Sequence, residues 1–404
     1  MEDNRNRVVY LSYDGLTDPL GQSQIMPYLG ALGKMGFQIT ILSFEKQDRF
    51  SEYKQVVYDW CQNHQVQWIP LAYHKHPPVL STLLDLTRLW WSLKRVYSRE
   101  PFTLVHCRSY LVALIGLLAR QRWKVKFLFD MRGFWADERV EGGLWNLQNP
   151  VYRLIYRFFK NRERVLLANA DHVISLTENA RKVIEGWGFT VPITIIPTCV
   201  DTDLFNTERV DQQTKALTRS KFQIAQDDFV LLYLGSWGTW YETNRMLQFF
   251  YALRKRHPKS VFLIVTQDAV SPTDLFAPES FRITTASRAQ VPFLISIAQA
   301  AVCFIKPSFS KRASSATKLG EIMAMGVPVV VNRGWGDVDS LIPRPLLVDD
   351  FSDLETQRVL DHILDNHRDE TPLSNGYVSL AEGVERYASV YHAMGVHMAT
   401  VPKI

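Results

Sequence analysis

The sequence predicts an α/β protein built from two doubly wound parallel sheets. Short apolar segments alternate with helical stretches along most of the 404 residues, and this alternation is typical of parallel sheets covered by helices. The alternation is interrupted within residues 197–228, where a polar and charged stretch follows a proline, and then it resumes. Length also favours more than one domain, since a domain holds about 150 residues. We therefore place a domain boundary in this stretch.

Composition narrows the class of protein. The chain is 47% hydrophobic and 22% charged, which is ordinary for a globular protein, and its net charge of +5 does not indicate a nucleic-acid partner. The longest apolar segment, residues 111–119, is much shorter than the roughly 20 residues of a membrane-spanning helix, and the polar residues 1–7 do not resemble a signal peptide. We expect a cytoplasmic protein, soluble or peripheral at the inner face of a membrane. The scattered cysteines predict buried thiols, not a metal or disulfide framework; they are Cys61, Cys107, Cys199 and Cys303.

The first half begins with a strand and a glycine-containing loop. Strands are predicted at residues 8–12, 38–43, 66–69, 104–106, 126–130, 172–175 and 193–196. The loop after the first strand, residues 13–24, lies at the sheet edge where ligands bind. Gly15 and Gly21 allow close approach of backbone, and Gln22 and Ser23 offer hydrogen-bond donors to an acceptor substrate. A plain loop with Asp-Gly and Asp-Pro turns explains the pattern equally well. The absence of a G-x-G-x-x-G sequence disfavours a dinucleotide dehydrogenase.

Two further strand ends in this half carry polar groups. His106 could be a base or a hydrogen-bond donor, or it could be structural. Residues 129–143 place charges between aromatic residues and glycines, which favours a sugar or phosphate site over a solvated charged face. The charged residues of this segment that we consider are Asp130, Arg132, Asp137 and Glu138.

A basic helix is predicted at residues 151–167. Five cations lie among tyrosines and phenylalanines, so the helix could rest on an anionic membrane. It could equally be a core helix with a solvated basic side, and the sequence leaves both open.

The second half repeats the alternation. Strands are predicted at residues 230–234, 261–265, 281–284, 302–305 and 329–331, and helices at 243–257, 292–300 and 380–394. In the loop 235–241, Gly235 and Ser236 give backbone access, while Trp237 and Trp240 could stack on a ring. A third glycine-rich loop follows at residues 332–339 and is expected at the same edge.

The stretch from 305 to 331 predicts an anion site. A serine-rich loop, which includes Ser314, runs into a helix that is expected to open near Ser315 and Ala316, and backbone N–H groups at a helix start attract phosphate. A cation in the first turn, Lys318, opposes the helix dipole, which is understandable if an anion lies between them. Lys318 shares a helix face with Glu321. The alternative is a solvated Lys318–Glu321 pair on a surface helix.

With these motifs the chain resembles a bacterial glycosyltransferase of family 4 with the GT-B fold. The matching segments are residues 168–184, 196–205, 233–241 and 314–330. The resemblance implies two facing Rossmann-like domains with a deep cleft: residues 1–200 for a glycan, lipid-linked or small-molecule acceptor and 201–378 for a nucleotide-sugar donor. Residues 379–404 would form a helix that crosses back to the first domain. It also implies transfer with retention at the anomeric carbon, without a cofactor or a required metal.

The resemblance also assigns roles by position. Glu321 looks like the glutamate that holds the donor ribose, Ser315, Thr317 and Lys318 the groups that face the diphosphate, and Arg245 part of an Arg–Lys phosphate pair. Arg132 falls near the catalytic-loop histidine of many relatives. Ala313 departs from the family, which usually has an acidic residue there. Two other functions remain open, a nucleotide-sugar epimerase of the same fold and a non-catalytic nucleotide-sugar-binding or scaffold protein.

Overall fold

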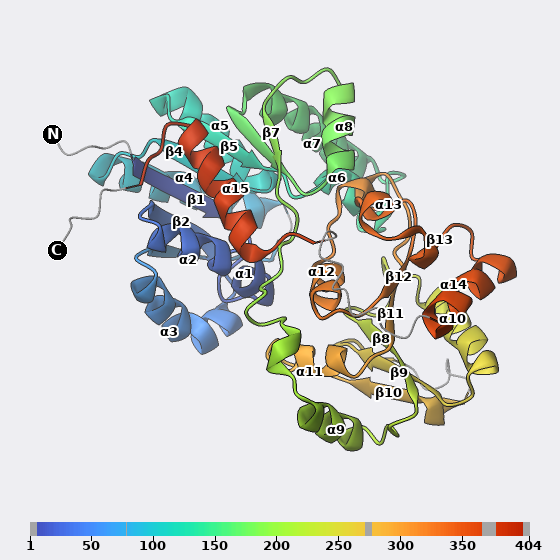
Figure 1. The fold of residues 1–404 in the computed structure, drawn as a ribbon. Coiled ribbons are helices and arrows are strands. Elements are labelled where there is room, and N and C mark those ends of the chain that lie inside the picture. The colour runs from blue at the N-terminus through green and yellow to red at the C-terminus, as the bar shows by residue number, and fades with distance from the viewer. Residues whose placement is uncertain (1–5, 78, 271–276, 366–376, 399–404) are drawn as a thin grey trace. The chain divides into compact units, whose positions relative to one another are not determined.

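The computed structural model describes residues 6–77, 79–270, 277–365 and 377–398. The chain forms two compact units (Figure 1). Unit 1 comprises Met1–Pro197 together with Leu380–Ile404, and unit 2 comprises Thr198–Ser379. Each unit is built around one open parallel sheet, which confirms the predicted fold class.

The sheet of unit 1 has seven strands in the order β3-β2-β1-β4-β5-β6-β7, all parallel. The strands are β1 (Arg7–Ser12), β2 (Gln38–Glu45), β3 (Gln67–Ala72), β4 (Leu104–Arg108), β5 (Lys126–Asp130), β6 (His172–Ser175) and β7 (Ile193–Ile195). The two central strands, β1 and β4, are almost wholly buried, as expected for a sheet that is covered on both faces. The order reverses between them, and such a switch point is where open α/β sheets bind ligands.

Helices cover both faces of this sheet. They are α1 (Pro19–Gln24), α2 (Met26–Lys34), α3 (Gln47–Asn63), α4 (Leu80–Arg99), α5 (Tyr110–Trp123), α6 (Trp135–Glu141), α7 (Pro150–Asn169), α8 (Glu178–Gly186) and α15 (Leu380–Ala393). Right-handed crossovers place α2 and α3 on one face and α4, α5 and α7 on the other, and α4 and α7 both pack against α5. The C-terminal helix α15 packs beside α2 (Figure 1).

The sheet of unit 2 has six parallel strands in the order β10-β9-β8-β11-β12-β13. They are β8 (Phe229–Leu234), β9 (Ser260–Val265), β10 (Phe281–Thr284), β11 (Ala300–Cys303), β12 (Val329–Asn332) and β13 (Leu347–Val348). The helices are α9 (Gln212–Lys221), α10 (Thr243–Arg256), α11 (Val291–Ser296), α12 (Thr317–Ala324), α13 (Val338–Leu341) and α14 (Asp353–Asp365). Strands β8, β9, β11 and β12 lie at the centre of one continuous apolar core.

Several predicted boundaries in unit 2 were wrong. The strand predicted at 302–305 ends at Cys303, because the backbone of Ile305 is held by the side chain of Asn332 and not by a neighbouring strand. Helix α11 ends at Ser296, four residues earlier than predicted. Helix α12, by contrast, begins at Thr317 with Ala316 as its N-cap, which agrees with the predicted opening near Ser315 and Ala316. Strand β13 and helix α9 were missed. In the described part of the chain, no helix has the length and apolar character needed to cross a membrane.

Candidate functional site

The start of α12 and the loop after β8 meet at Lys318 in unit 2. The Lys318 Nζ atom lies 3.6 Å from the ring centroid of Tyr241 and 4.7 Å from that of Tyr233, and 3.5 Å from Tyr233 Oη. Gly235 passes directly over this ammonium group with φ +123°, and a Cβ atom there would be 2.3 Å from Nζ. Only glycine fits both the conformation and the space. The structure thus brings two predicted phosphate-site motifs together.

The charge of Lys318 is held in an apolar setting. Burial lowers the pKa of Lys318 to about 8, and the nearby Cys303 and Glu321 only partly oppose this effect. The two tyrosine faces attract the cation, but no ion pair is recorded for Lys318 among the residues that the structure describes. An anion at the helix start would therefore gain both the charge of Lys318 and the positive end of α12.

Glu321 is buried on the same helix, next to Arg288. The Oε1 atom of Glu321 lies 3.4 Å from Nη1 of Arg288. Burial raises the pKa of Glu321, and Arg288 counteracts this increase. The alternative of a solvated Lys318–Glu321 surface pair is wrong, because both side chains are buried. Arg288 was missed, although it lies in the segment after strand β10 and could have been found as another polar strand end.

The serine loop packs on its own neighbours. Ser315 Oγ lies 2.8 Å from Thr198 Oγ1 and accepts a hydrogen bond from the Thr198 N–H at 3.1 Å. The N–H of Gly336 donates to the Lys311 carbonyl at 2.7 Å, and a Cβ atom at Gly336 would lie 2.4 Å from the Ser314 carbonyl oxygen. The glycine loop after β12 therefore lies directly against the serine loop, as expected for loops at one sheet edge.

The remaining residues that were predicted for the donor site divide into two groups. In the loop after β8, the Ser236 carbonyl accepts from Tyr233 Oη, and the Trp237 N–H donates to Asp268 at 2.7 Å. The ammonium group of Lys311 lies 3.8 Å from the ring centroid of Trp240. Arg245, by contrast, is exposed on α10, where its guanidinium group lies over the ring of Phe351 and donates to Gln248. The structure therefore does not bring it to Lys318.

A second cluster lies at the strand ends of unit 1, around the buried Asp130. Nη2 of Arg108 and Nη2 of Arg132 both donate to the amide oxygen of Gln24, at 2.9 and 3.1 Å, and both guanidinium groups lie within 4.0 Å of Asp130. His106 Nε2 is 3.5 Å from Asp130 Oδ2. We call Gln24, His106, Arg108, Asp130 and Arg132 the strand-end cluster. Arg108 was missed, although it directly ends strand β4.

Helix α15 secures this cluster. Tyr391 Oη lies 2.8 Å from His106 Nδ1, and Tyr387 Oη donates to Asp130 at 3.2 Å. Burial lowers the pKa of His106, so the imidazole is neutral near pH 7. Burial alone would raise the pKa of Asp130, but the charge of Arg132, the adjacent imidazole of His106 and the charge of Arg108 hold it below its usual value. The full burial of His106 and its bond to Tyr391 favour the structural alternative for this residue.

Arg132 has an unusual backbone conformation. Its φ is +59°, in the left-handed region that few residues other than glycine occupy. Such strain costs about 1–3 kcal/mol and persists where the surroundings fix the conformation. In the strand-end cluster, Asp130 Oδ1 and His106 Nε2 are buried without a hydrogen-bond partner among the described residues.

The glycines of the first loop serve close packing within unit 1. A Cβ atom at Gly21 would lie 2.0 Å from the Gly15 carbonyl oxygen, and one at Gly15 would lie 2.6 Å from the Glu45 carboxylate. This buried carboxylate accepts from the N–H groups of Leu16 and Thr17 at 2.9 and 3.1 Å. The Ser23 hydroxyl donates to Pro19, and Gln22 donates to Thr17. In this conformation the loop therefore uses its own donors, and Glu45, which organises it, was missed.

Residues 129–143 do not form one cluster. Asp137 lies on α6 and accepts from Tyr156 Oη at 2.8 Å and from Lys160 Nζ at 2.7 Å. Lys160 also contacts Glu163, so Asp137 belongs to the contact between α6 and α7. Glu138 is half-buried on α6. Of the charged residues predicted in this segment, Asp130 and Arg132 lie in the strand-end cluster.

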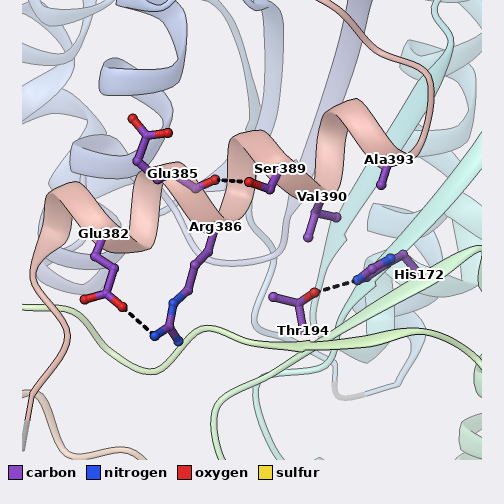
Figure 2. A pocket seen from close by; sticks show the side chains of 8 residues that line it. All are labelled: His172, Thr194, Glu382, Glu385, Arg386, Ser389, Val390 and Ala393. Atoms are coloured by element: carbon purple, nitrogen blue, oxygen red, sulfur yellow. Dashed lines mark hydrogen bonds and ion pairs between the residues drawn. The ribbon is translucent and has the colours of Figure 1, made fainter.

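An open pocket of about 360 Å³ lies between α15 and strands β6 and β7 of unit 1 (Figure 2). Its guanidinium group, Arg386, is already engaged by Glu382 at 2.6 Å and by the Ile195 carbonyl at 2.7 Å. His172 lies 2.8 Å from Thr194. No residue of the predicted sites lines this pocket. Among the residues described, no group of three or more His, Cys, Asp or Glu side chains could hold a metal ion.

Comparisons with known proteins show a family match for part of the chain and a shared fold for nearly all of it. Residues 28–204 match the family model Glycosyltransferase Family 4. No curated protein matches the sequence. Among solved structures, Alr3699/HepE of Anabaena, in complex with UDP and glucose, has 13% identity and a TM-score of 0.64, with 96% of this chain and 99% of that chain covered.

Two other structures extend the likeness. A glycosyltransferase from Rickettsia africae has 13% identity and a TM-score of 0.67 over 96% of this chain and 98% of that one. A UDP-forming trehalose-phosphate synthase from Burkholderia vietnamiensis has 10% identity and a TM-score of 0.63 over 96% and 100%. These comparisons support a glycosyltransferase of the GT-B type. The resemblance to family 4 glycosyltransferases is thereby confirmed, by the family model over residues 28–204 and by the fold over nearly the whole chain.

Proposed function

We propose that this chain is a retaining glycosyltransferase of polysaccharide biosynthesis. Unit 2 binds a nucleotide-diphosphate-sugar donor, and unit 1 binds a glycan, lipid-linked or small-molecule acceptor. The observation that carries the proposal is the buried ammonium group of Lys318, held between two tyrosine rings at the start of α12. A cation buried without a carboxylate partner at a helix N-terminus fits an anionic ligand better than any structural role.

The chemistry of the site follows from its charges. When the bond between the sugar and the diphosphate of the donor breaks, negative charge develops on the departing nucleoside diphosphate. Fixed positive groups stabilise that transition state. Lys318 and the first N–H groups of α12 supply this charge in unit 2. They do so without a metal or a cofactor in our proposal. Arg132 is proposed as a further contributor from unit 1.

On the acceptor side, we propose that the sheet edge around the strand-end cluster binds the acceptor. Two guanidinium groups converge on one amide oxygen there, and the left-handed backbone of Arg132 is the kind of strain that collects at functional sites. Guanidinium groups suit polyhydroxylated and anionic acceptors, since each offers five N–H donors.

A ligand screen tests the donor. Because the Anabaena structure contains UDP and glucose, UDP and UDP-sugars come first in a thermal-shift series, with GDP- and ADP-sugars beside them. A donor that raises the unfolding temperature is then incubated with candidate acceptors, and the anomeric configuration of the product is read by NMR. Failure of every nucleotide sugar to bind would contradict the proposal. An inverted product would contradict retention alone.

The two alternatives are separated by the same reagents. An epimerase of this fold releases free nucleotide from the donor and water without an acceptor. A non-catalytic binding or scaffold protein shows the thermal shift but neither hydrolysis nor transfer. A glycosyltransferase releases nucleotide in step with the formation of glycosylated acceptor.

Glu321→Gln is expected to weaken nucleotide binding by roughly 10- to 100-fold, which corresponds to the loss of a charged hydrogen bond. The ionised carboxylate next to Arg288 can accept two O–H bonds from a ribose, and the amide retains the size of the side chain but not its charge. Calorimetric titration with the donor measures the effect. Glu279→Gln, at an exposed position of unit 2, is the matched control. Equal affinity in wild type and Glu321→Gln would refute the ribose role.

Donor affinity is expected to fall with pH above about 8. The pKa of Lys318 is lowered to about 8 in the free protein, whereas a bound diphosphate favours the charged ammonium and raises that pKa. Affinity is therefore level below pH 8 and decreases by up to about tenfold for each pH unit above it. Calorimetry between pH 6.5 and 9.5 measures this slope. The variant Lys318→Arg, which stays charged, should show a flat profile, and a flat wild-type profile would exclude Lys318 as the titrating contact.

A further inference from the structure

The outer side of one helix layer in unit 1 exposes large apolar side chains. Helices α4, α5 and α7 cover one face of the seven-stranded sheet. Their exposed apolar residues are Leu80, Leu83, Leu84 and Trp91 on α4, Leu118 on α5, and Val151, Tyr152, Leu154 and Phe158 on α7. Trp91 is 65% and Leu154 69% exposed. We call the outer side of these three helices the three-helix face. Such a concentration of exposed apolar groups marks an interaction surface.

On α7 and α4, the exposed apolar residues form a stripe along one side of the helix. On α7, residues 151, 154 and 158 recur at helical spacing, while the opposite side buries Glu163 and Leu167. On α4, residues 80, 84 and 91 form a similar stripe opposite the buried Leu86, Leu89 and Leu93. The apolar positions that face outward are therefore additional to those that pack the core.

The helices of the layer are fixed to one another. The indole of Trp123 on α5 stacks on Trp90 of α4 at 5.1 Å and on Tyr97 of α4 at 4.3 Å between centroids. Tyr110 of α5 donates to the buried Glu163 of α7. The exposed residues thus lie on a rigid platform and not on separate mobile helices.

The three-helix face is also strongly basic. Helices α4, α5 and α7 contain eleven Lys and Arg residues but only two acids, Asp85 and Glu163, and both acids are buried. The chain as a whole has a net charge of only +5, so the rest of the molecule is acidic by comparison. The exposed cations are Arg88, Arg95, Arg99, Arg122, Arg153, Arg157, Arg162 and Arg164. This asymmetry selects an anionic partner.

The mixture of charges and apolar groups distinguishes between partners. A second copy of the chain would bring this positive surface against an identical one, which like-charge repulsion disfavours. Nucleic acid would use the cations but would leave the leucines in water. An anionic bilayer uses both, because apolar side chains enter the acyl boundary while Arg and Lys meet the headgroups. Trp91, with the Lys94 ammonium 4.4 Å from its ring centroid, fits the preference of tryptophan for membrane interfaces.

We propose that the three-helix face of unit 1 docks the protein peripherally on an anionic lipid bilayer. The proposal takes the membrane-surface interpretation of the helix at 151–167 and adds α4 and α5 to that surface. The docking does not depend on the proposed transfer reaction, since it needs neither donor nor acceptor. In a chain that also acts on lipid-linked acceptors, it would bring unit 1 to the layer in which they reside.

Vesicle binding tests the proposal with the full-length protein. Sedimentation with vesicles of phosphatidylcholine containing 30% phosphatidylglycerol is compared with vesicles of phosphatidylcholine alone. We expect binding to the first kind that is at least tenfold tighter, and that weakens as salt shortens the reach of the charges. Equal binding to both kinds, or none to either, would overturn the proposal. A concentration-dependent dimer that hides the face in place of vesicle binding would also overturn it.

Paired variants separate the two contributions. The double variant Arg95→Gln/Arg157→Gln should weaken partition by roughly 25-fold, at about fivefold for each cation near an anionic surface, whereas Lys221→Gln/Lys255→Gln in unit 2 should change it little. Leu154→Asp should weaken partition at least tenfold. Its matched control is Leu354→Asp on α14 of unit 2, where the leucine is 83% exposed. The substitutions in all four variants are at the surface, so unchanged unfolding temperatures verify the fold. Equal loss in a control and its test variant would refute the assignment to this face.

Discussion

Replacing Lys318 by methionine is expected to lower kcat by about 10²-fold or more, the range observed when one donor to a developing oxyanion is lost. Methionine fills the space between Tyr233 and Tyr241 but carries no charge. The positive end of α12 remains, so some catalysis remains with it. Steady-state kinetics with the donor identified by the thermal-shift series measure this loss.

Two comparisons make the Lys318 prediction specific. Lys318→Arg keeps the charge but must fit a longer, planar group beneath Gly235, so its kcat should lie between those of wild type and Lys318→Met. Thermal unfolding of Lys318→Met should be unchanged or higher, because a buried cation without an ion-pair partner is costly to the folded state. A kcat within threefold of wild type, in a folded Lys318→Met protein, would remove Lys318 from the reaction.

Asp130→Ala is expected to destabilise unit 1 by about 3–5 kcal/mol, the usual effect of removing one member of a buried ion pair. Three groups depend on this carboxylate: the guanidinium groups of Arg108 and Arg132, and the hydroxyl of Tyr387. Without it, two positive charges remain at a buried sheet edge with less compensation. Denaturant unfolding followed by tryptophan fluorescence measures the change, and the transition of unit 1 should move to lower denaturant.

Asp130→Asn and Asp14→Asn are the controls for this prediction. Asparagine can still accept from Tyr387, so Asp130→Asn should lose less stability than Asp130→Ala. Asp14 also faces Arg108, at 3.7 Å, but is half exposed, and its replacement should change stability by less than about 1 kcal/mol. Similar unfolding curves for Asp130→Ala and wild type would show that the positive charges of Arg108 and Arg132 do not need the Asp130 carboxylate for the stability of unit 1.

The sequence was sufficient for most of the sheet architecture because apolar strands bounded by polar residues are recognisable without tertiary information. Strands at Lys126–Asp130, His172–Ser175 and Phe281–Thr284 begin and end at the predicted residues. Strand β13 could not be predicted, because two residues, Leu347 and Val348, contain no periodic pattern. Helix α9 lies in a charged stretch, where the single stripe that packs on α11 is obscured by lysines and arginines.

The candidate site was predictable only as a set of loops at a sheet edge. The rule that parallel strands present their carboxyl ends together placed Gly235 near Lys318. It could not reveal that Tyr233 and Tyr241 form the walls around the ammonium group, since a strand tyrosine and a loop tyrosine look like core residues. The partners Arg288 and Glu45 were missed because ion pairs and buried carboxylates join positions far apart in sequence. Arg245 was assigned by likeness alone, and its side chain points elsewhere.

The return of the chain into unit 1 has a consequence for biosynthesis. His106 and Asp130 contact tyrosines that lie 285 and 257 residues later in the chain. At about 5–20 residues per second, a ribosome needs roughly 15–60 s to make that interval. Unit 2 is continuous in sequence and can fold within this time. Unit 1 lacks α15 until the end of synthesis, so His106 and Asp130 lack their tyrosine partners until then. Unit 1 can therefore complete its strand-end cluster only after the last helix has been made.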